Sequence, residues 1–109
     1  MAREKFYETR IKRYIQEQGG WRVKFFANKY TKAGVPDILS CINGYLVGIE
    51  VKADAGHPTP LQLHTIEQIR AAGGFAFVLY PSGWERFKEF VDDLKQDTFN
   101  REEMPVIIK

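Results

Sequence analysis

The stretch GVPDILSCINGYLVGIEVK, residues 34–52, places two apolar segments on either side of Asn43-Gly44. Asn-Gly between apolar runs is typical of a β-hairpin, because a two-residue type I′ turn needs positive φ at both central positions. If residues 43 and 44 form that turn, counting outward along the two strands places Asp37 opposite Glu50. A three-residue turn would instead shift the register and separate the two acids.

Opposed side chains lie roughly 4.5–5.5 Å apart on one face of a sheet. Lys52 shares the face of Glu50, and Leu39, Cys41 and Leu46 make the rest of that face apolar. Two ionised carboxylates are costly there, and a divalent cation compensates, since Mg²⁺ prefers one or two carboxylates with water and phosphate oxygens. The alternative is that both acids are exposed at the open end of the hairpin, with Lys52 in a surface salt bridge.

Two helices add polar residues to this pattern. Residues 4–18 have helical spacing and carry Glu8 on their apolar stripe, so this acid points towards whatever the helix packs on. A second helix is expected from Pro60 to about Ala72, with Gln62 on its sheet-facing side. Gln62 either reaches the acids or bonds a loop carbonyl, and the spacing leaves the roles of Glu8 and Gln62 open.

The remaining segments predict an α/β fold, a mixed central sheet flanked by helices, in one domain over residues 1–109. Residues 21–28 alternate apolar and basic side chains, as a half-buried strand does, and 75–80 are continuously apolar, as in a strand covered on both faces. Ser82 and Glu85 predict a capping box at the start of a third helix. The closing PVIIK is expected to be an edge strand.

Composition limits the function classes. With 109 residues, 44% hydrophobic and 28% charged, the chain matches neither a disordered nor a membrane protein. No apolar run reaches the ~20 residues that span a bilayer, there is no signal-peptide core, and Cys41 is the single cysteine, so we expect a cytoplasmic protein. His57 and His64 lack partners for a zinc site, and no nucleotide-cofactor pattern occurs.

Charge is distributed unevenly along the chain. Residues 1–36 hold nine Lys or Arg and three acids, whereas the other 73 residues hold seven Lys or Arg and eleven acids. A basic segment joined to an acidic remainder indicates a polyanionic partner at one end. A solvated helix face would give the same count, so composition alone does not separate the two interpretations.

The motif residues resemble a known family. Pro36-Asp37 and then Glu50-Val51-Lys52 on the following strand match the P-D…(D/E)-x-K pattern of the PD-(D/E)XK nuclease superfamily. More narrowly, AGVPDIL…GIEVKADAGHPTPLQLHTIEQIRAAGG is similar to the VRR-NUC (virus-type replication-repair nuclease) family, over residues 4–80. The resemblance implies a restriction-endonuclease-like αβββαβ core and a Mg²⁺- or Mn²⁺-dependent phosphodiesterase acting on DNA.

The same resemblance implies a role for each matching residue. Lys52 would lie against the attacking water or the phosphate, either stabilising charge or acting as a base, and Gln62 would orient Lys52 or the scissile phosphate. The expected metal ligands are Asp37, Glu50 and the Val51 carbonyl, with Glu8 as a further acid near the metal or its water. The expected phosphate contacts are Arg10, Arg13, Lys29 and Lys32.

Stand-alone members of this family resemble Holliday-junction resolvases, which work as symmetric dimers. The expected function is therefore a structure-specific endonuclease that hydrolyses branched or junction DNA as a homodimer, in bacterial or phage replication and repair. The first alternative is a non-catalytic DNA-binding module that retains the nuclease fold. The second is an RNA-directed or protein-interaction role.

Overall fold

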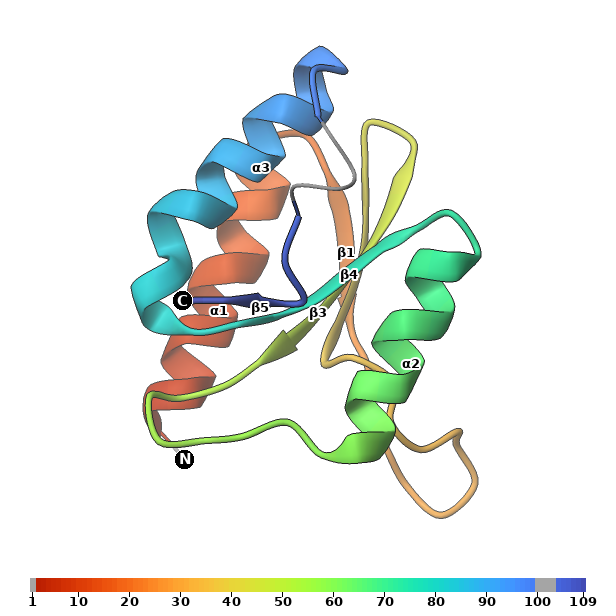
Figure 1. Ribbon diagram of the computed structural model, residues 1–109. Coiled ribbons are helices and arrows are strands. Elements are labelled where there is room, and N and C mark those ends of the chain that lie inside the picture. The colour runs from red at the N-terminus through yellow and green to blue at the C-terminus, as the bar shows by residue number, and fades with distance from the viewer. Residues whose placement is uncertain (1, 100–103) are drawn as a thin grey trace.

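The computed structural model describes residues 2–99 and 104–109, whose elements follow the predicted order and end in the expected edge strand (Figure 1). A short 3₁₀ helix, η1, precedes the last α-helix. The elements are α1 (Ala2–Glu17), β1 (Trp21–Lys24), β2 (Ile38–Ile42), β3 (Tyr45–Val51), α2 (Pro60–Ala71), β4 (Phe75–Leu79), η1 (Pro81–Gly83), α3 (Trp84–Gln96) and β5 (Ile107–Ile108).

The β2–β3 hairpin has the predicted two-residue turn. Asn43 and Gly44 both have positive φ, 49° and 85°, as a type I′ turn requires. The antiparallel ladder runs from Ile42 opposite Tyr45 back to Ile38 opposite Ile49. The predicted register is therefore confirmed, and one further step along the two strands leads to Asp37 and Glu50.

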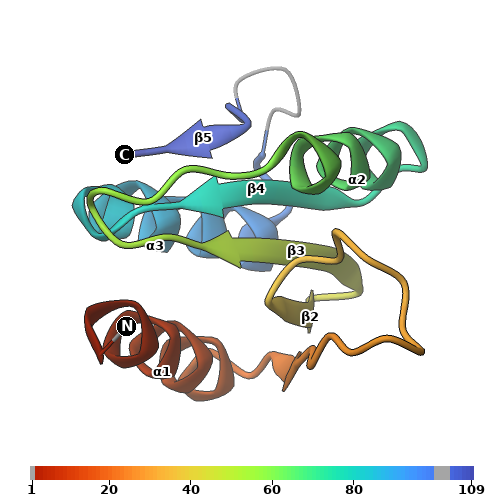
Figure 2. The ribbon, with the colours of Figure 1, turned by 90° about the horizontal axis from the view of Figure 1, so that it is seen from below.

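Among the described residues the sheet has five strands in the order β1-β2-β3-β4-β5. The pairs β1–β2 and β2–β3 are antiparallel, while β3–β4 and β4–β5 are parallel. Helix α2 makes the connection from β3 to β4 and covers one face of the sheet, and α1 and α3 cover the other (Figure 1). Seen from below, β3 and β4 lie between α1 and α2 (Figure 2).

Most of the buried apolar surface lies between the sheet and helices α1 and α3. Ile11 and Ile15 of α1 and Phe87 of α3 are fully buried there against β2, β3 and β4. A smaller cluster around Ile66 fills the space under α2. Every residue of β4 is buried, as its continuous apolar run predicts. In the described part of the chain, no helix has the length and apolar character needed to cross a membrane.

The first strand is shorter than predicted, and its apolar side chains are the more exposed ones. Strand β1 ends at Lys24 rather than at residue 28. Trp21 and Val23 are 64% and 39% exposed, whereas Arg22 and Lys24 are half-buried. The reason is that α1 offers β1 polar partners, Arg22 bonding Gln16 at 2.9 Å, while α2 packs over β3 and β4 and leaves the other face of β1 open.

The predicted capping box of Ser82 and Glu85 is also wrong. Pro81 begins the 3₁₀ turn η1, which takes up Ser82, so α3 starts only at Trp84 with Gly83 as its N-cap and no side-chain cap. A Cβ at residue 83 would lie 2.6 Å from the Ile108 carbonyl oxygen. The close approach of β5 therefore decides how this helix begins.

Replacing Gly44 by Ala should destabilise the protein by about 1 kcal/mol, because an L-residue with a Cβ is strained in the left-handed region. Chemical denaturation monitored by circular dichroism measures this cost. Gly44→Asn is the matched control, since Asn tolerates positive φ, and it should cost less. Equal stability of Gly44→Ala and the wild type would contradict the type I′ turn.

Candidate functional site

Asp37 and Glu50 lie together at the open end of the hairpin. The Glu50 side chain is only 1% exposed and that of Asp37 is 26% exposed. Burial, followed by the negative charge of Asp37, raises the pKa of Glu50 to about 8, although Lys52 acts in the opposite direction. The alternative of two solvated surface acids is therefore wrong for Glu50, which is a buried carboxyl beside a second one.

The backbone holds Asp37 in this position. Pro36 packs over Gly48, where an added Cβ would lie 3.1 Å from the proline ring, so a larger residue there would press on the proline. The Asp37 carbonyl accepts a hydrogen bond from the Phe25 amide at 2.8 Å. Its carboxylate Oδ2 accepts one from the Val51 amide at 2.9 Å. Main-chain contacts therefore hold both the backbone and one carboxylate oxygen of Asp37.

Glu50 has two polar partners on one carboxylate oxygen. Lys52 Nζ lies 3.2 Å from Oε2, and Gln62 Nε2 donates to the same oxygen at 3.1 Å. Gln62 Oε1 also accepts from the Thr59 amide at 2.8 Å in the capping box that begins α2. Of the two alternatives expected for Gln62, contact with the acids is therefore the one observed. The other hydrogen bond of the Gln62 side chain is made to a backbone amide and not to a loop carbonyl.

Glu8 points into the fold as predicted, but its partner is a residue that sequence reasoning missed. The Lys24 ammonium lies 2.5 Å from Glu8 Oε1 and 3.5 Å from Asp37 Oδ1. Burial acts to lower the pKa of Lys24, but the Glu8 and Asp37 carboxylates outweigh it and raise that pKa. The alternation of apolar and basic residues in the first strand did not say which face meets α1, so nothing in the sequence pattern directed Lys24 towards the acids.

The three acids do not form one metal-binding group. In residues 2–99 and 104–109 no set of three or more His, Cys, Asp or Glu side chains is close enough to hold an ion. Asp37 and Glu50 still offer two carboxylates, and one or two carboxylates with water satisfy Mg²⁺. Glu50 Oε1 is buried without a hydrogen-bond partner in the described chain, which fits an oxygen that takes a hard cation as its ligand.

The four basic residues expected to bind phosphate are dispersed. The Arg10 guanidinium stacks 4.1 Å over the ring of Trp84. Arg13 lines a groove of ≈ 580 Å³ along α1. Lys29 lies 5.0 Å over the ring of Tyr30 in the loop before β2. Lys32 belongs to a different groove, so the structure does not gather these residues into a single patch.

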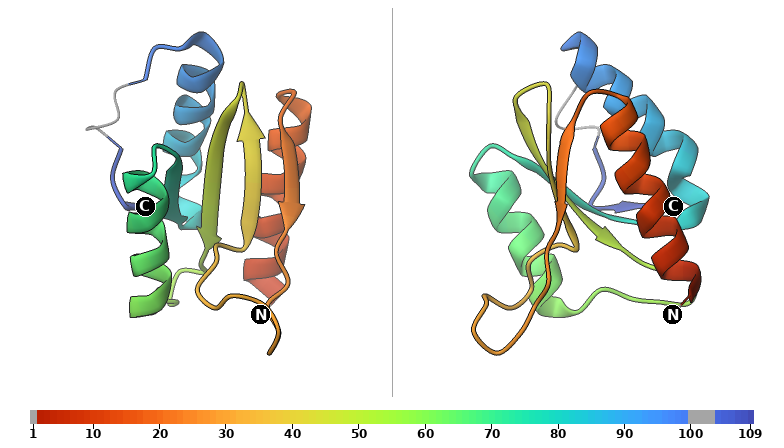
Figure 3. Two further views of the ribbon diagram at one scale, coloured as in Figure 1. Left: turned by 90° about the vertical axis from the view of Figure 1, so that its right-hand side faces the viewer. Right: turned by 180° about the vertical axis from the view of Figure 1, so that it is seen from behind.

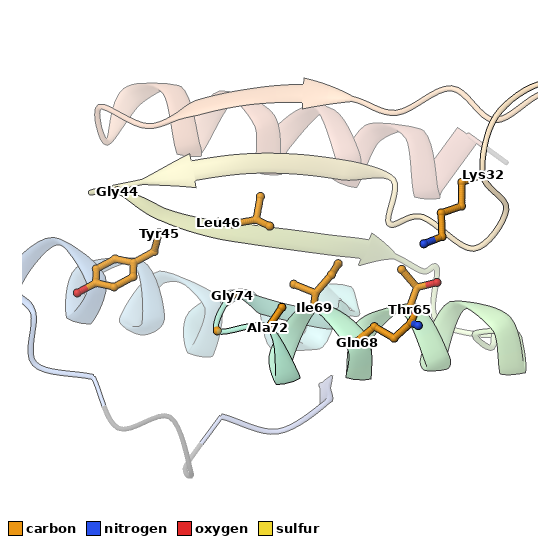
Figure 4. A pocket seen from close by; sticks show the side chains of 10 residues that line it. Lys32, Gly44, Tyr45, Leu46, Thr65, Gln68, Ile69, Ala72 and Gly74 are labelled. Atoms are coloured by element: carbon orange, nitrogen blue, oxygen red, sulfur yellow. The ribbon is translucent and has the colours of Figure 1, made fainter.

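That second groove, of ≈ 540 Å³, runs between α2 and β3 (Figure 4). Lys32, Thr65 and Gln68 lie towards one end of it, and Tyr45 and Gly44 lie at the other. The hairpin turn is therefore part of this groove, whereas the carboxylates lie at the opposite end of the hairpin. The groove is separate from the acidic site.

Comparison with known proteins does not add a family. The chain matches no protein-family model and no curated protein sequence. The resemblance to the VRR-NUC family therefore stays a prediction, and the geometry around Asp37 and Glu50 is the basis for assigning a function.

The raised pKa of Glu50 predicts that stability falls as the pH rises. Between its ordinary value of 4.5 and about 8, the folded chain keeps a proton that the unfolded chain has released, so folding becomes less favourable through this interval. Thermal melts in EDTA from about pH 5 to about pH 8 measure the decline. It should be smaller in Glu50→Gln and unchanged in Glu89→Gln, an exposed control on α3. An identical decline in Glu50→Gln would contradict the assignment.

Proposed function

We propose that the chain is a metal-dependent nuclease that hydrolyses phosphodiester bonds in DNA, with a restriction-endonuclease-like core of the VRR-NUC type. The observation that carries this proposal is the pair of carboxylates Asp37 and Glu50 at the end of one hairpin, with Lys52 3.2 Å from Glu50. Two ionised acids this close, one of them buried, are unfavourable unless a proton or a cation neutralises part of their charge. The element order α-βββ-α-β supports the same assignment.

Asp37 and Glu50 would hold Mg²⁺ or Mn²⁺ through their carboxylates, with the Val51 carbonyl as a third donor. Glu50 Oε1 supports this ligand set, because it is buried and has no hydrogen-bond partner within residues 2–99 and 104–109. When bound, the ion polarises the scissile phosphate and lowers the pKa of a coordinated water. Glu8 is assigned a supporting role, since Lys24 lies between it and Asp37.

Lys52 and Gln62 organise the side of the site that faces α2. Gln62 is fixed at the first turn of that helix by its bond to Thr59, and its amide holds the Glu50 carboxylate in place. The Lys52 side chain is 15% exposed, so its ammonium is partly shielded from water and its charge is little screened. It would stabilise negative charge that develops on the phosphate during attack.

DNA is the proposed substrate because basic and aromatic side chains flank the site. Lys12, Arg13 and Arg22 line the groove along α1 and β1. On the other side, the loop between β1 and β2 projects beside the N-terminal end of α2 (Figure 3) and carries Lys29 with Tyr30, which is 84% exposed. Such groups neutralise phosphates and stack on bases. Branched or junction DNA follows from the family resemblance.

The direct test is cleavage of labelled single-stranded, duplex, flap and junction DNA with Mg²⁺, Mn²⁺ or EDTA. Asp37→Asn and Glu50→Gln should lower the cleavage rate at least about a hundredfold, because each removes negative charge that holds the ion. Glu89→Gln is the control on α3. Cleavage that persists in EDTA or in both variants would contradict the proposal.

Lys52→Ala separates a nuclease from a binding module. A nuclease loses cleavage and keeps DNA affinity in a gel shift, whereas a non-catalytic DNA-binding module shows binding without cleavage in the wild type as well. Competing RNA against DNA in the same gel shift tests the RNA-directed alternative.

A homodimer is the proposed assembly. In register across β1, β2 and β3, Trp21 pairs with Cys41 and Cys41 with Leu46, and all three are exposed on the side of the sheet that α2 covers only in part. Leu39 and Val23 form the next pair on that face. A row of exposed apolar side chains of this kind supports association with a second copy.

Trp21→Glu should weaken that association at least about tenfold, since buried aromatic residues dominate interface energies. Sedimentation velocity at micromolar concentration measures it. Phe6→Glu, at a 76% exposed position on α1, is the matched control and should leave the dimer intact. If the wild-type protein sediments as a monomer, the proposed dimer is wrong, while the proposed nuclease activity is not affected.

A further inference from the structure

We propose that Lys24 is a positioning residue that holds Glu8 beside Asp37 and limits how tightly the carboxylates bind a divalent cation. The inference rests on the proposed function, because it concerns the affinity of the same site. It goes further by giving a role to a lysine outside the P-D…(D/E)-x-K motif.

One ammonium group connects three elements. Lys24 is the last residue of β1 and pairs in register with Ile38, the residue after Asp37. Its side chain turns to the α1 face of the sheet, where Nζ contacts Glu8 Oε1 at 2.5 Å and Asp37 Oδ1 at 3.5 Å. Apart from this ion pair, Glu8 Oε1 has no hydrogen-bond partner among the described residues. Lys24 is therefore the group that neutralises Glu8 and turns it towards Asp37.

The charges of the cluster define the expected effect on a metal ion. With all three carboxylates ionised, as binding of a metal ion requires, Glu8, Asp37 and Glu50 share the two ammonium groups of Lys24 and Lys52, which gives a formal charge of −1. A positive charge within a few ångströms of the ligands repels an incoming divalent cation. Removing the Lys24 charge leaves −2, and the site should then attract the ion more strongly.

The ligands themselves do not depend on Lys24 for their positions. Asp37 is held by the amides of Val51 and Phe25, and Glu50 is held by Lys52 and Gln62. Glu8 is the residue that would lose its partner and remain as an unpaired buried carboxylate, which destabilises a fold. Loss of Lys24 should therefore lower the stability of the metal-free protein but raise its affinity for a metal ion. Loss of a purely structural residue would lower both the stability and the affinity.

The experiment measures both quantities with Mn²⁺ as the probe. Calorimetric titration with MnCl₂ gives affinity, and thermal melts in EDTA give stability. Lys24→Met should bind Mn²⁺ on the order of tenfold more tightly and melt at a lower temperature. Lys24→Arg keeps the charge and should stay near the wild type. Lys88→Met is the surface control, because the ion pair of Lys88 with Glu85 lies on α3.

A double variant keeps the test decisive if Lys24→Met folds poorly. Glu8→Gln with Lys24→Met removes the unpaired acid and restores a formal charge of −1, so stability and Mn²⁺ affinity should both return towards the wild type. Mn²⁺ affinity that is unchanged or weaker in Lys24→Met, while Asp37→Asn abolishes binding, would overturn the role of Lys24 alone. A wild-type protein that binds no Mn²⁺ would overturn the proposed function together with this inference.

Discussion

The close approach of Asp37 and Glu50 is imposed by the backbone against the repulsion of their charges. The left-handed turn at Asn43-Gly44 sets the register of the hairpin, and the Val51 amide fixes the Asp37 carboxylate. The neighbouring side chains can be understood as compensation for this constraint. Lys52 and Gln62 both contact one oxygen of Glu50, while the other oxygen has no hydrogen-bond partner in the part of the chain that the structure describes. Burial and the charge of Asp37 raise the pKa of Glu50 to about 8.

The polar side chains around Asp37 and Glu50 also connect the layers of the fold. Gln62 links the first turn of α2 to β3, since the same amide closes the capping box with Thr59 and bonds Glu50. Lys24 links β1 to α1 through Glu8 on the opposite face of the sheet. Residues that serve the proposed chemistry are therefore also contacts between elements, so their effects on stability and on metal binding have to be measured separately.

The two faces of the sheet are covered unequally, and this follows from where α2 crosses. Helix α2 packs over β3 and β4, so the same face of β1 and β2 is left with exposed Trp21 and Cys41. On the other face, α1 and α3 bury an extensive aromatic and aliphatic core. The polar side chains of β1 consequently face α1, and this places Lys24 next to the acids. The apolar side chains of β1 face solvent.

Local interactions determined what the sequence by itself predicted. The Asn43-Gly44 turn involves residues only a few positions apart, so the turn signal was sufficient for the hairpin register and for placing Asp37 near Glu50. Whether Gln62 reaches the acids was left open by the sequence, and the packing of α2 decided it. Tertiary structure decided the orientation of β1, because α1 contacts one of its faces through polar side chains and α2 leaves the other face open. Contacts between residues far apart in the sequence also determined other features. They include the contact between Lys24 and Glu8, the position of Ile108 against the start of α3, and the dispersal of the basic residues.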